Sequence, residues 1–231
     1  PFWNAFPRSP MVMDFSFGGE NYFIINNHFK CCGDGILDLN DEFDEENRRY
    51  TAMNLLKTYI DVNLSNEKVI VLGDLNDDIS ESYQNNIFQD VLNDSDNYQF
   101  ADLFIAQGNS SNWSFPNWPS HLDHILITNE LHGGFDSIEV NTIKIDDYIN
   151  GGWEEYDQNI SDHRPVAMKI YFNYELSYDL NNDEIVNDDD INILVLFIFD
   201  QNNNQFLGDI NFDSKIDIFD LLCLSDHLYG Q

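Results

Sequence analysis

The sequence has few basic residues for its length. Its 231 residues include 10 Lys and Arg against 42 Asp and Glu, which gives a formal net charge of −32 at pH 7. Proteins that hold nucleic acid by its phosphates normally present a basic face. Either bound divalent cations and high ambient salt offset this charge, or the ligand is not a long polyanion. We favour the first interpretation, because net charge governs solubility and association rather than chemistry.

Long apolar runs and cysteines are also scarce. No apolar run approaches the roughly 20 residues that cross a bilayer, so the sequence predicts no membrane span. The three cysteines allow at most one intrachain disulfide. Cys31 and Cys32 are adjacent and would bridge each other only under strain, and Cys223 is expected to be buried and inert on an apolar helix face. The cysteine count therefore indicates nothing about the compartment.

The apolar content is nevertheless sufficient for a packed core. Hydrophobic residues make up 42% of the chain and aromatic residues 14%, which excludes disorder throughout. The length suits one domain with a small appendage. Because the chain begins with Pro and shows no charged-then-apolar leader, we expect a fragment or a processed piece.

Apolar segments bounded by Gly, Asn, Asp or Pro alternate with helical patterns. Tyr50, Leu56 and Ile60 recur at helical spacing and predict a long helix at 44–64, with a shorter one at 85–92. Strands are predicted at 11–17, 21–29, 68–73, 122–128, 137–145 and 166–172. Strands interleaved with helices favour an α/β sandwich of two packed sheets.

Four short polar strings end or interrupt these strands. Each brings His, Asp or Asn to the end of an apolar segment, where a rigid scaffold presents reactive groups. In chain order they are Asn27-His28, Gly73-Asp74-Leu75-Asn76, Asp123-His124 and Ser161-Asp162-His163-Arg164-Pro165. One string alone is a weak signal, because a His beside an Asp is often a structural pair and Asp suits a turn. Four in this order are a strong signal.

The four strings in this order resemble the endonuclease/exonuclease/phosphatase superfamily. The resemblance is greatest to its secreted bacterial nucleases, through the segment HFKCCGDG, the RRYTAMNLLKTYI helix and GDLND. The resemblance covers roughly residues 1–172. It implies a two-sheet α/β sandwich of the deoxyribonuclease-like type, and hydrolysis of phosphate esters with Mg²⁺ or Mn²⁺ at the catalytic site.

The resemblance is incomplete at the start of the chain. Family members carry an Asn and a metal-binding Glu upstream of the position of His28. Only Glu20 precedes His28 here, in a segment that reads as a hairpin turn. We therefore expect the first part of the fold to be missing, which would leave apolar strand surface uncovered.

The resemblance also implies a role for the residues of the strings. Asp74 would orient or deprotonate the attacking water, and Asn76 would hydrogen-bond a phosphate oxygen as charge builds there. Asp162 would bind the catalytic ion and His163 would supply an imidazole. Asp123 matches the acidic partner that fixes the tautomer of this imidazole and raises its pKa.

The resemblance also suggests residues that would protonate the leaving group and residues that would bind the substrate. His28 matches a candidate general acid of the deoxyribonuclease-like branch, and Asn27 beside it is assigned to the substrate. Arg8 stands where that branch has an Arg before a strand and could grip a phosphate. Trp113 and Trp118 lie in a loop before the third string. They either stack on bases in a substrate cleft or cap the sheet edge.

The pattern changes after Phe172. Two Asp/Asn clusters place side-chain oxygens at the spacing of a calcium loop leading into a helix. They are Asp179, Asn181, Asp183, Asn187 and Asp190, then Asp209, Asn211, Asp213, Asp217 and Asp220. Helices are expected at 190–199 and 220–229, after a linker at 173–178. The duplicated unit, 179–231, resembles a type I dockerin, which implies Ca²⁺ and a cohesin-type partner; a calcium-stabilised spacer is the alternative.

These features together predict a secreted, divalent-metal-dependent phosphodiesterase, most simply an endonuclease acting on DNA or RNA. Calcium at the concentrations such loops need is chiefly extracellular, which supports secretion. A phosphomonoesterase or a sphingomyelinase-like enzyme of the same superfamily is the first alternative, favoured by the acidic charge. The second is a non-catalytic calcium-dependent attachment protein with an incomplete nuclease-like domain.

Overall fold

The computed structural model describes residues 4–17, 20–132, 135–172, 178–181, 183, 185–199, 208–211 and 215–230. The chain divides into two compact units, one made of Pro1–Phe15 and Asn21–Phe172 and the other of Ser16–Glu20 and Asn173–Gln231. Within the described residues, no helix has the length and apolar character needed to cross a bilayer.

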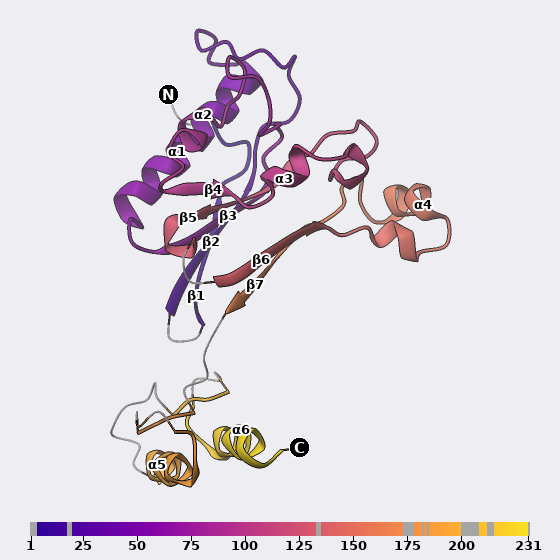
Figure 1. The fold of residues 1–231 in the computed structure, drawn as a ribbon. Coiled ribbons are helices and arrows are strands. Elements are labelled where there is room, and N and C mark those ends of the chain that lie inside the picture. The colour runs from indigo at the N-terminus through magenta and orange to yellow at the C-terminus, as the bar shows by residue number, and fades with distance from the viewer. Residues whose placement is uncertain are drawn as a thin grey trace. The chain divides into compact units, whose positions relative to one another are not determined.

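A mixed five-stranded sheet forms the centre of the larger unit (Figure 1). Its strands are β1 (Met11–Phe17), β2 (Glu20–His28), β3 (Lys68–Asp74), β4 (Tyr98–Phe100) and β5 (Asp123–Thr128). Their order in the sheet is β1-β2-β3-β5-β4. Strands β2 and β3 are parallel, whereas β5 runs antiparallel to both β3 and β4.

Helix α1 (Glu45–Asn63) confirms the long helix predicted from the spacing of apolar residues. It begins after Asp44, whose side chain accepts a hydrogen bond from Asn47 N at 2.7 Å. Such an N-cap satisfies a backbone donor that has no partner within the helix. Two glutamates in the first turn also interact favourably with the positive end of the helix dipole.

The central strands of the five-stranded sheet are buried on both faces. Val69 and Val71 pack with Met53 of α1 in one apolar cluster. Ile70 and Ile125 belong to a second cluster on the opposite face, because successive side chains along a strand alternate between faces. This apolar character on both faces explains why the β3 segment reads as an unbroken apolar run.

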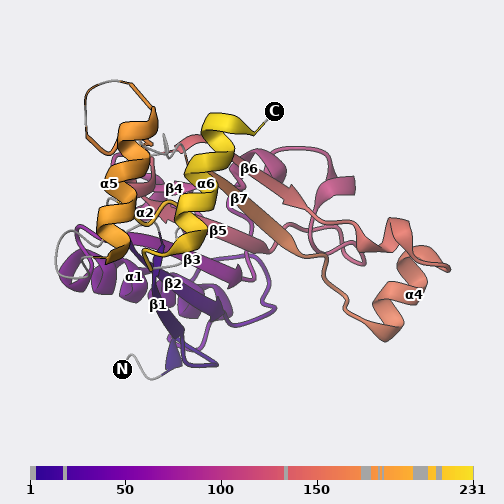
Figure 2. The ribbon, with the colours of Figure 1, turned by 90° about the horizontal axis from the view of Figure 1, so that it is seen from below.

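The second face is covered by a separate two-stranded sheet of β6 (Phe135–Thr142) and β7 (Val166–Phe172) (Figure 2). Val140 and Met168 pack into the second apolar cluster, alongside residues of β3 and β5. A mixed α/β fold with two packed sheets is therefore confirmed. The predicted strand at 137–145 was misplaced, since β6 starts earlier and ends at Thr142.

The remaining elements of this unit are short. They are α2 (Gln89–Leu92), α3 (Leu103–Ala106), α4 (Gly152–Asn159) and the 3-10 turns η2 (Ser110–Asn112), η3 (Asn129–Leu131) and η4 (Ile145–Tyr148). The helix predicted at 85–92 is thus wrong except for its last turn. Strand β4 and helices α3 and α4 were not predicted, because elements this short carry too little periodic pattern.

Strand β1 exposes its apolar side chains on both faces at the edge of the sheet. All seven of its residues are exposed, and Met11 reaches 62% of its maximal exposure. This edge strand therefore leaves apolar surface uncovered among the described residues.

Gly73 permits the close approach of β2 and β3 at the end that carries the polar strings. It has a φ of 130°, and a Cβ added there would collide with the backbone oxygen of Asn27. We expect Gly73→Ala to lower the free energy of unfolding by about 1–3 kcal/mol, the usual cost of forcing extra volume into a packed site. Gly35→Ala is the matched control, because Gly35 also has a positive φ but no atom within 4 Å of an added Cβ. Equal losses in urea unfolding would contradict the steric explanation.

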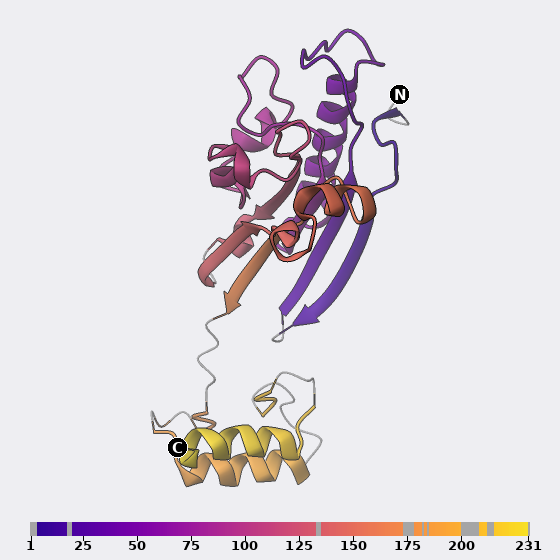
Figure 3. The ribbon, with the colours of Figure 1, turned by 90° about the vertical axis from the view of Figure 1, so that its right-hand side faces the viewer.

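The described part of the smaller unit contains two helices, α5 (Asp188–Phe199) and α6 (Ile218–Tyr229), which lie side by side (Figure 3). Leu194 and Leu224 are fully buried between them, in a cluster with residues of the two preceding loops. The helices predicted at 190–199 and 220–229 are confirmed, each beginning two residues earlier than expected.

The two loop–helix repeats have the same internal hydrogen bonds. Asp190 Oδ1 accepts from Leu180 N at 2.7 Å and its Oδ2 accepts from Asn187 N at 2.8 Å. Asp220 repeats this with Ile210 N and Asp217 N, at 2.6 and 2.8 Å. Both carboxylates are fully buried and satisfied by backbone donors, so calcium binding stays a prediction.

Predicted calcium ligands of the first loop are hydrogen-bonded to one another. Asp183 N donates to Asp179 Oδ1 at 3.1 Å, and Asn181 Nδ2 donates to Asp183 Oδ2 at 2.9 Å. Asp213 and residues 173–177 of the predicted linker lie outside the described residues.

Candidate active site

Three of the four polar strings meet at one end of the five-stranded sheet because of the strand register. His28 pairs with Asp74 at the end of the parallel strands β2 and β3. The antiparallel strand β5 begins opposite, with Asp123 paired to Asp74. The fourth string forms the turn before β7 and brings His163 to the same place. Strand ends thus gather side chains that are far apart in the sequence, as predicted.

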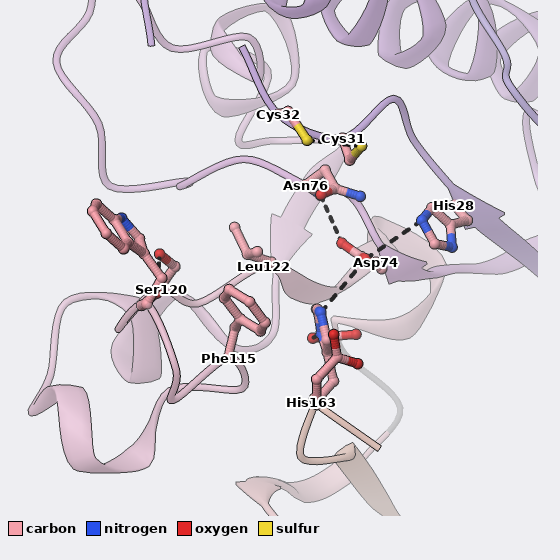
Figure 4. A pocket seen from close by; sticks show the side chains of 12 residues that line it. His28, Cys31, Cys32, Asp74, Asn76, Phe115, Ser120, Leu122 and His163 are labelled. Carbon is pink, nitrogen blue, oxygen red and sulfur yellow. Dashed lines mark hydrogen bonds and ion pairs between the residues drawn. The ribbon is translucent and has the colours of Figure 1, made fainter. Parts of the chain in front are cut away.

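The side chains form a chain of ionisable groups (Figure 4). His163 Nδ1 lies 2.6 Å from Asp123 Oδ2, which is hydrogen-bonding distance. On the other side of the ring, His163 Nε2 lies 3.9 Å from Asp74 Oδ2. His28 Nε2 lies 3.6 Å from the same Asp74 oxygen. Asp74 is therefore flanked by two imidazoles, and one of them is held by a second carboxylate.

The turn after β3 fixes Asn76 beside Asp74. Asn76 has a φ of 57°, in the left-handed region that Asn tolerates better than most residues. Its backbone N–H donates to Asp74 Oδ1 at 3.0 Å, and its side-chain Nδ2 donates to Phe29 O at 3.3 Å. Unusual backbone conformations of this kind cluster at functional sites.

The pKa values of three of these groups, Asp74, Asp123 and His163, are shifted from the values of the free side chains. Burial, and then the charge of Asp123, raise the pKa of Asp74. Burial opposes ionisation of Asp123 as well, but the hydrogen bond and charge of His163, together with the Ser114 hydroxyl, outweigh it and lower the pKa of Asp123. Burial likewise disfavours the His163 imidazolium, but the hydrogen bond and charge of Asp123 outweigh it and raise the pKa of His163. The arrangement therefore favours an ion pair of Asp123 carboxylate and His163 imidazolium.

The turn that carries His163 is stabilised by residues that do not belong to the four polar strings. Arg164 forms a two-pronged ion pair with buried Asp146, with Nε–Oδ1 and Nη2–Oδ2 distances of 2.9 and 2.5 Å. Arg164 N also donates to Ser114 O at 2.7 Å. The supporting roles of Asp146 and Ser114 were not predicted, because neither stands in a recognisable string. Arg164 itself was visible in the fourth string.

A pocket of ≈ 830 Å³ opens over these groups. It is lined by His28, Cys31, Cys32, Asp74, Asn76, Phe115, Trp118, Ser120, Leu122, Asp123, Asp162 and His163 (Figure 4). The predicted site residues His28, Asp74, Asn76, Asp123, Asp162, His163 and Trp118 are all brought together here. Phe115, which comes from the same aromatic loop as Trp118, also lines the pocket, and its ring centroid lies 4.8 Å from that of His163.

Three predicted substrate contacts do not line this pocket. Asn27 is buried, and its Nδ2 donates to Ile25 O at 3.0 Å. Trp113 packs into the second apolar cluster and donates its indole N–H to Ile105 O at 3.0 Å, so it supports the fold rather than stacking in the pocket. Arg8 is exposed and is not among the lining residues.

A buried cluster beside β5 was missed by the sequence analysis. Asp102, His121 and His124 are at most 2% exposed. Asp102 Oδ2 lies 3.0 Å from His121 Nε2 and 2.6 Å from His124 Nδ1, and Asp102 Oδ1 accepts from Ile125 N at 2.8 Å. His124 Nε2 lies 2.8 Å from Asp77 O. The cluster thus ties β5 to the turn that follows β3.

The hydrogen-bond partners of His121 and His124 indicate which of their ring nitrogens carry hydrogen. Both ring nitrogens of His124 face acceptors, so both carry hydrogen and His124 is an imidazolium paired with the Asp102 carboxylate. Burial disfavours both charges, but their mutual attraction raises the pKa of His124 and lowers that of Asp102. His121 Nδ1 accepts from Ser114 N at 3.3 Å, which leaves its Nε2 to donate to Asp102.

Several groups in this unit have the composition of a cation site. Asp102, His121 and His124 each present one ligand atom within 4.8 Å of the others, as do Asp34, Asp44 and Glu46. In the first group, however, hydrogen bonds already satisfy the ligand atoms.

The pocket itself also offers ligands for a hard cation. It gathers the carboxylates of Asp74, Asp123 and Asp162 and the amide of Asn76, and such oxygens are the ligands that Mg²⁺ and Mn²⁺ prefer. Burial, and then the charge of Asp123, raise the pKa of Asp74, and a bound cation would offset the charge of Asp123. The donor set therefore fits a divalent ion.

Comparisons with known proteins give only distant likenesses. No protein-family model and no curated protein matches the chain. Among solved structures, truncated TDP2 of Caenorhabditis elegans has a TM-score of 0.44 and 15% identity over 72% of this chain and 62% of that one. The human Nocturnin catalytic domain with bound sulfate gives 0.41 and 15%, over 69% and 52%. Beta toxin of Staphylococcus aureus gives 0.40 and 16%, over 70% and 57%.

The chain spans less than two thirds of the length of each of these structures. At such identities the likeness concerns the fold alone. What the protein does must therefore be inferred from the geometry of the pocket.

Proposed function

We propose that the protein is a divalent-metal-dependent phosphodiesterase that hydrolyses nucleic acid as an endonuclease. The observation that carries the proposal is the arrangement of Asp123, His163, Asp74 and His28 around one open pocket. Two imidazoles on either side of a half-buried carboxylate supply what in-line displacement at phosphorus needs: a group that aims water, a donor for the phosphoryl oxygens and a proton for the leaving oxygen.

Each residue has a distinct role in the proposed reaction. Asp74 orients the attacking water and accepts its proton. His163, held as an imidazolium by Asp123, donates from Nε2 to a phosphoryl oxygen as negative charge develops there, and Asn76 assists. His28 donates a proton to the departing oxygen. The raised pKa of Asp74 makes its carboxylate a better proton acceptor than an ordinary Asp.

A divalent cation, Mg²⁺ or Mn²⁺, would be held by Asp162 with the neighbouring carboxylates. Its chemistry would be to neutralise charge on the phosphoryl oxygens. The negative charge of the whole chain makes this neutralisation more important, because only 10 Lys and Arg stand against 42 Asp and Glu.

Trp118 and Phe115 favour a substrate that carries bases. Trp118 is 79% exposed on the pocket rim, and Phe115 lies beside His163. Aromatic faces stack on single-stranded bases without regard to sequence. A phosphomonoesterase or sphingomyelinase-like activity would use the same central groups, so comparing turnover of plasmid DNA, RNA, sphingomyelin and a phosphate monoester separates these alternatives.

The smaller unit is proposed to be a dockerin-like module. Its support is the duplicated loop–helix sequence and the identical hydrogen bonds of Asp190 and Asp220. Ca²⁺ binding, a cohesin-type partner and secretion are proposals that rest on this duplication. If the pocket is inactive, the whole chain would instead be a calcium-dependent attachment protein. Calorimetric titration with Ca²⁺ tests the module separately from the pocket.

Metal removal tests the proposed activity directly. Plasmid nicking is expected with Mg²⁺ or Mn²⁺, and EDTA should abolish it while excess Mg²⁺ restores it. Asp162→Asn should raise the Mg²⁺ concentration needed for half-maximal nicking. The control Asp96→Asn removes an exposed carboxylate that does not line the pocket and should leave this concentration unchanged. Nicking that persists in EDTA would contradict the metal-dependent mechanism.

A further inference from the structure

Two adjacent thiols form part of the pocket wall. Cys31 and Cys32 follow β2, are both exposed, and line the pocket together with Asp74 and His163 (Figure 4). Cys32 Sγ lies 2.9 Å from Cys31 Sγ. The proposed hydrolysis uses neither sulfur, so their presence at this position has no explanation in that reaction.

The backbone of this segment is held in place by two cationic side chains. Lys30 Nζ donates to Cys31 O at 2.8 Å. Arg49 Nη1 donates to Cys32 O at 2.6 Å and to Lys30 O at 2.9 Å. Arg49 is itself buried and paired with Asp77 at 2.8 Å. The carbonyl groups on both sides of the Cys31–Cys32 peptide bond are therefore fixed, and the two sulfurs are kept together.

The conformation of Cys32 is what brings the sulfurs together. Cys32 has a φ of 72°, in the left-handed region that non-glycine residues seldom occupy. Gly33 follows with a φ of 109°, and the Glu46 carboxylate occupies the space that a Cβ would need there. The loop conformation therefore holds the two sulfurs next to each other, and the strain expected in a bond between adjacent cysteines stays a prediction.

We propose that Cys31 and Cys32 are a reversible dithiol–disulfide site in the pocket wall, whose reaction partners are small external disulfides such as oxidised glutathione. A Cys31 thiolate attacks one sulfur of the external disulfide and releases one thiol, which leaves a mixed disulfide on Cys31. The Cys32 sulfur then attacks Cys31 Sγ and releases the second thiol. The two cysteines lose two protons and two electrons, and the external disulfide is reduced to two thiols.

The order of attack follows from the hydrogen bond between the sulfurs. The pKa of Cys32 is raised, first by its hydrogen bond to Cys31 and then by burial, so Cys32 keeps its proton while Cys31 reacts. Once a mixed disulfide forms, the adjacent sulfur is at very high effective concentration and closes the bond within the chain. Strained or exposed disulfides are also the ones that thiols reduce readily, which makes the site reversible.

Closure of this bond would change the pocket next to the proposed reaction centre. The sulfurs share the pocket with Asn76 and Trp118, so linking them alters the wall against which a substrate lies. This second consequence rests on the proposed function, whereas formation of the disulfide does not.

Thiol counting and mass spectrometry of the full chain test the site without any activity assay. After incubation with oxidised glutathione and removal of excess reagent, we expect two of the three cysteines to stop reacting with maleimide. The chain mass should fall by two hydrogen atoms, without added glutathione, and dithiothreitol should restore both thiols. Cys223, in the smaller unit, is half-buried rather than fully buried as expected. It is the internal control and should still be labelled. Peptide mapping should place the bond between Cys31 and Cys32.

Single substitutions provide the matched controls. Cys31→Ser and Cys32→Ser should each accumulate one glutathione adduct in place of the internal bond, and Cys223→Ser should behave like the unaltered chain. Stable adducts on Cys31 and Cys32 of the unaltered chain, a disulfide that links two chains, or three thiols that remain free would each overturn the proposal. If the bond forms and nicking is absent in both redox states, the proposed hydrolysis fails while the thiol site stands.

Discussion

His163→Ala is expected to lower the turnover number for plasmid nicking by about 10²–10⁴-fold, the usual contribution of a positioned acid or base. His163 Nδ1 lies 2.6 Å from Asp123 Oδ2 and its Nε2 lies 3.9 Å from Asp74. Removing the ring deletes the donor for the phosphoryl oxygens and leaves the carboxylates without their cationic partner. The measurement is the single-turnover rate of nicking at saturating Mg²⁺.

The loss should be specific to the imidazole and not to the fold. His163 is part-buried in a turn held by Arg164 and Asp146, so His163→Ala should retain the urea midpoint of the unaltered chain to within the change typical of surface substitutions. His132→Ala removes an exposed histidine outside the pocket and is the matched control. Equal turnover in the two variants would eliminate His163 from the proposed mechanism.

Asp123→Asn tests whether catalysis needs the charge of Asp123 beside His163 or only the His163 ring itself. The amide keeps the size of the side chain but no longer carries the charge that raises the pKa of His163. We expect turnover to fall with little change in KM, because the interaction is made chiefly in the transition state. A rise in KM alone would assign Asp123 to substrate binding.

The site could be predicted from the sequence to the extent that it depends on strand ends. His28, Asp74 and Asp123 each follow or open an apolar strand, and such positions meet wherever neighbouring strands end together. The register pairs Asp74 with both of the other residues. His163 lies before a strand of the second sheet, so its arrival at the site follows from the packing of two sheets rather than from one strand order.

The site residues that were wrongly predicted or missed can be explained by their positions in the fold. Asn27 is two residues from buried Ile25 and therefore shares its inward face, a pattern that should have excluded it as a substrate contact. Trp113 is held by the carbonyl of Ile105, a residue of a four-residue helix that no periodic pattern reveals. Supporting residues such as Asp102 act across the fold, and only tertiary packing shows their partners.

Asp102→Ala is expected to lower the free energy of unfolding by about 3–5 kcal/mol, the loss seen when one partner of a buried ion pair is removed. The substitution would leave the His124 imidazolium, His121 and Ile125 N without their common acceptor. Urea unfolding followed by tryptophan fluorescence measures the loss. The exposed-site control Asp96→Asn should stay within about 0.5 kcal/mol of the unaltered chain. A loss caused by EDTA in the unaltered chain but not in Asp102→Ala would instead show that a metal ion holds this cluster.

The pH dependence of stability tests the Asp102–His124 ion pair more directly. The quantity to compare is the free energy of unfolding of the unaltered chain and of Asp102→Asn at each pH. The pKa of Asp102 is lowered by folding, so its contribution is present above the unfolded value of about 3.9 and is lost as the pH falls through the folded value. The pKa of His124 is raised, so its contribution is present below about 6.5 and is lost as the pH rises through the folded value. The stability difference between the two chains should therefore be greatest between these limits and shrink on both sides. A difference that is constant across the whole pH range would show that Asp102 acts by shape and hydrogen bonding rather than by charge.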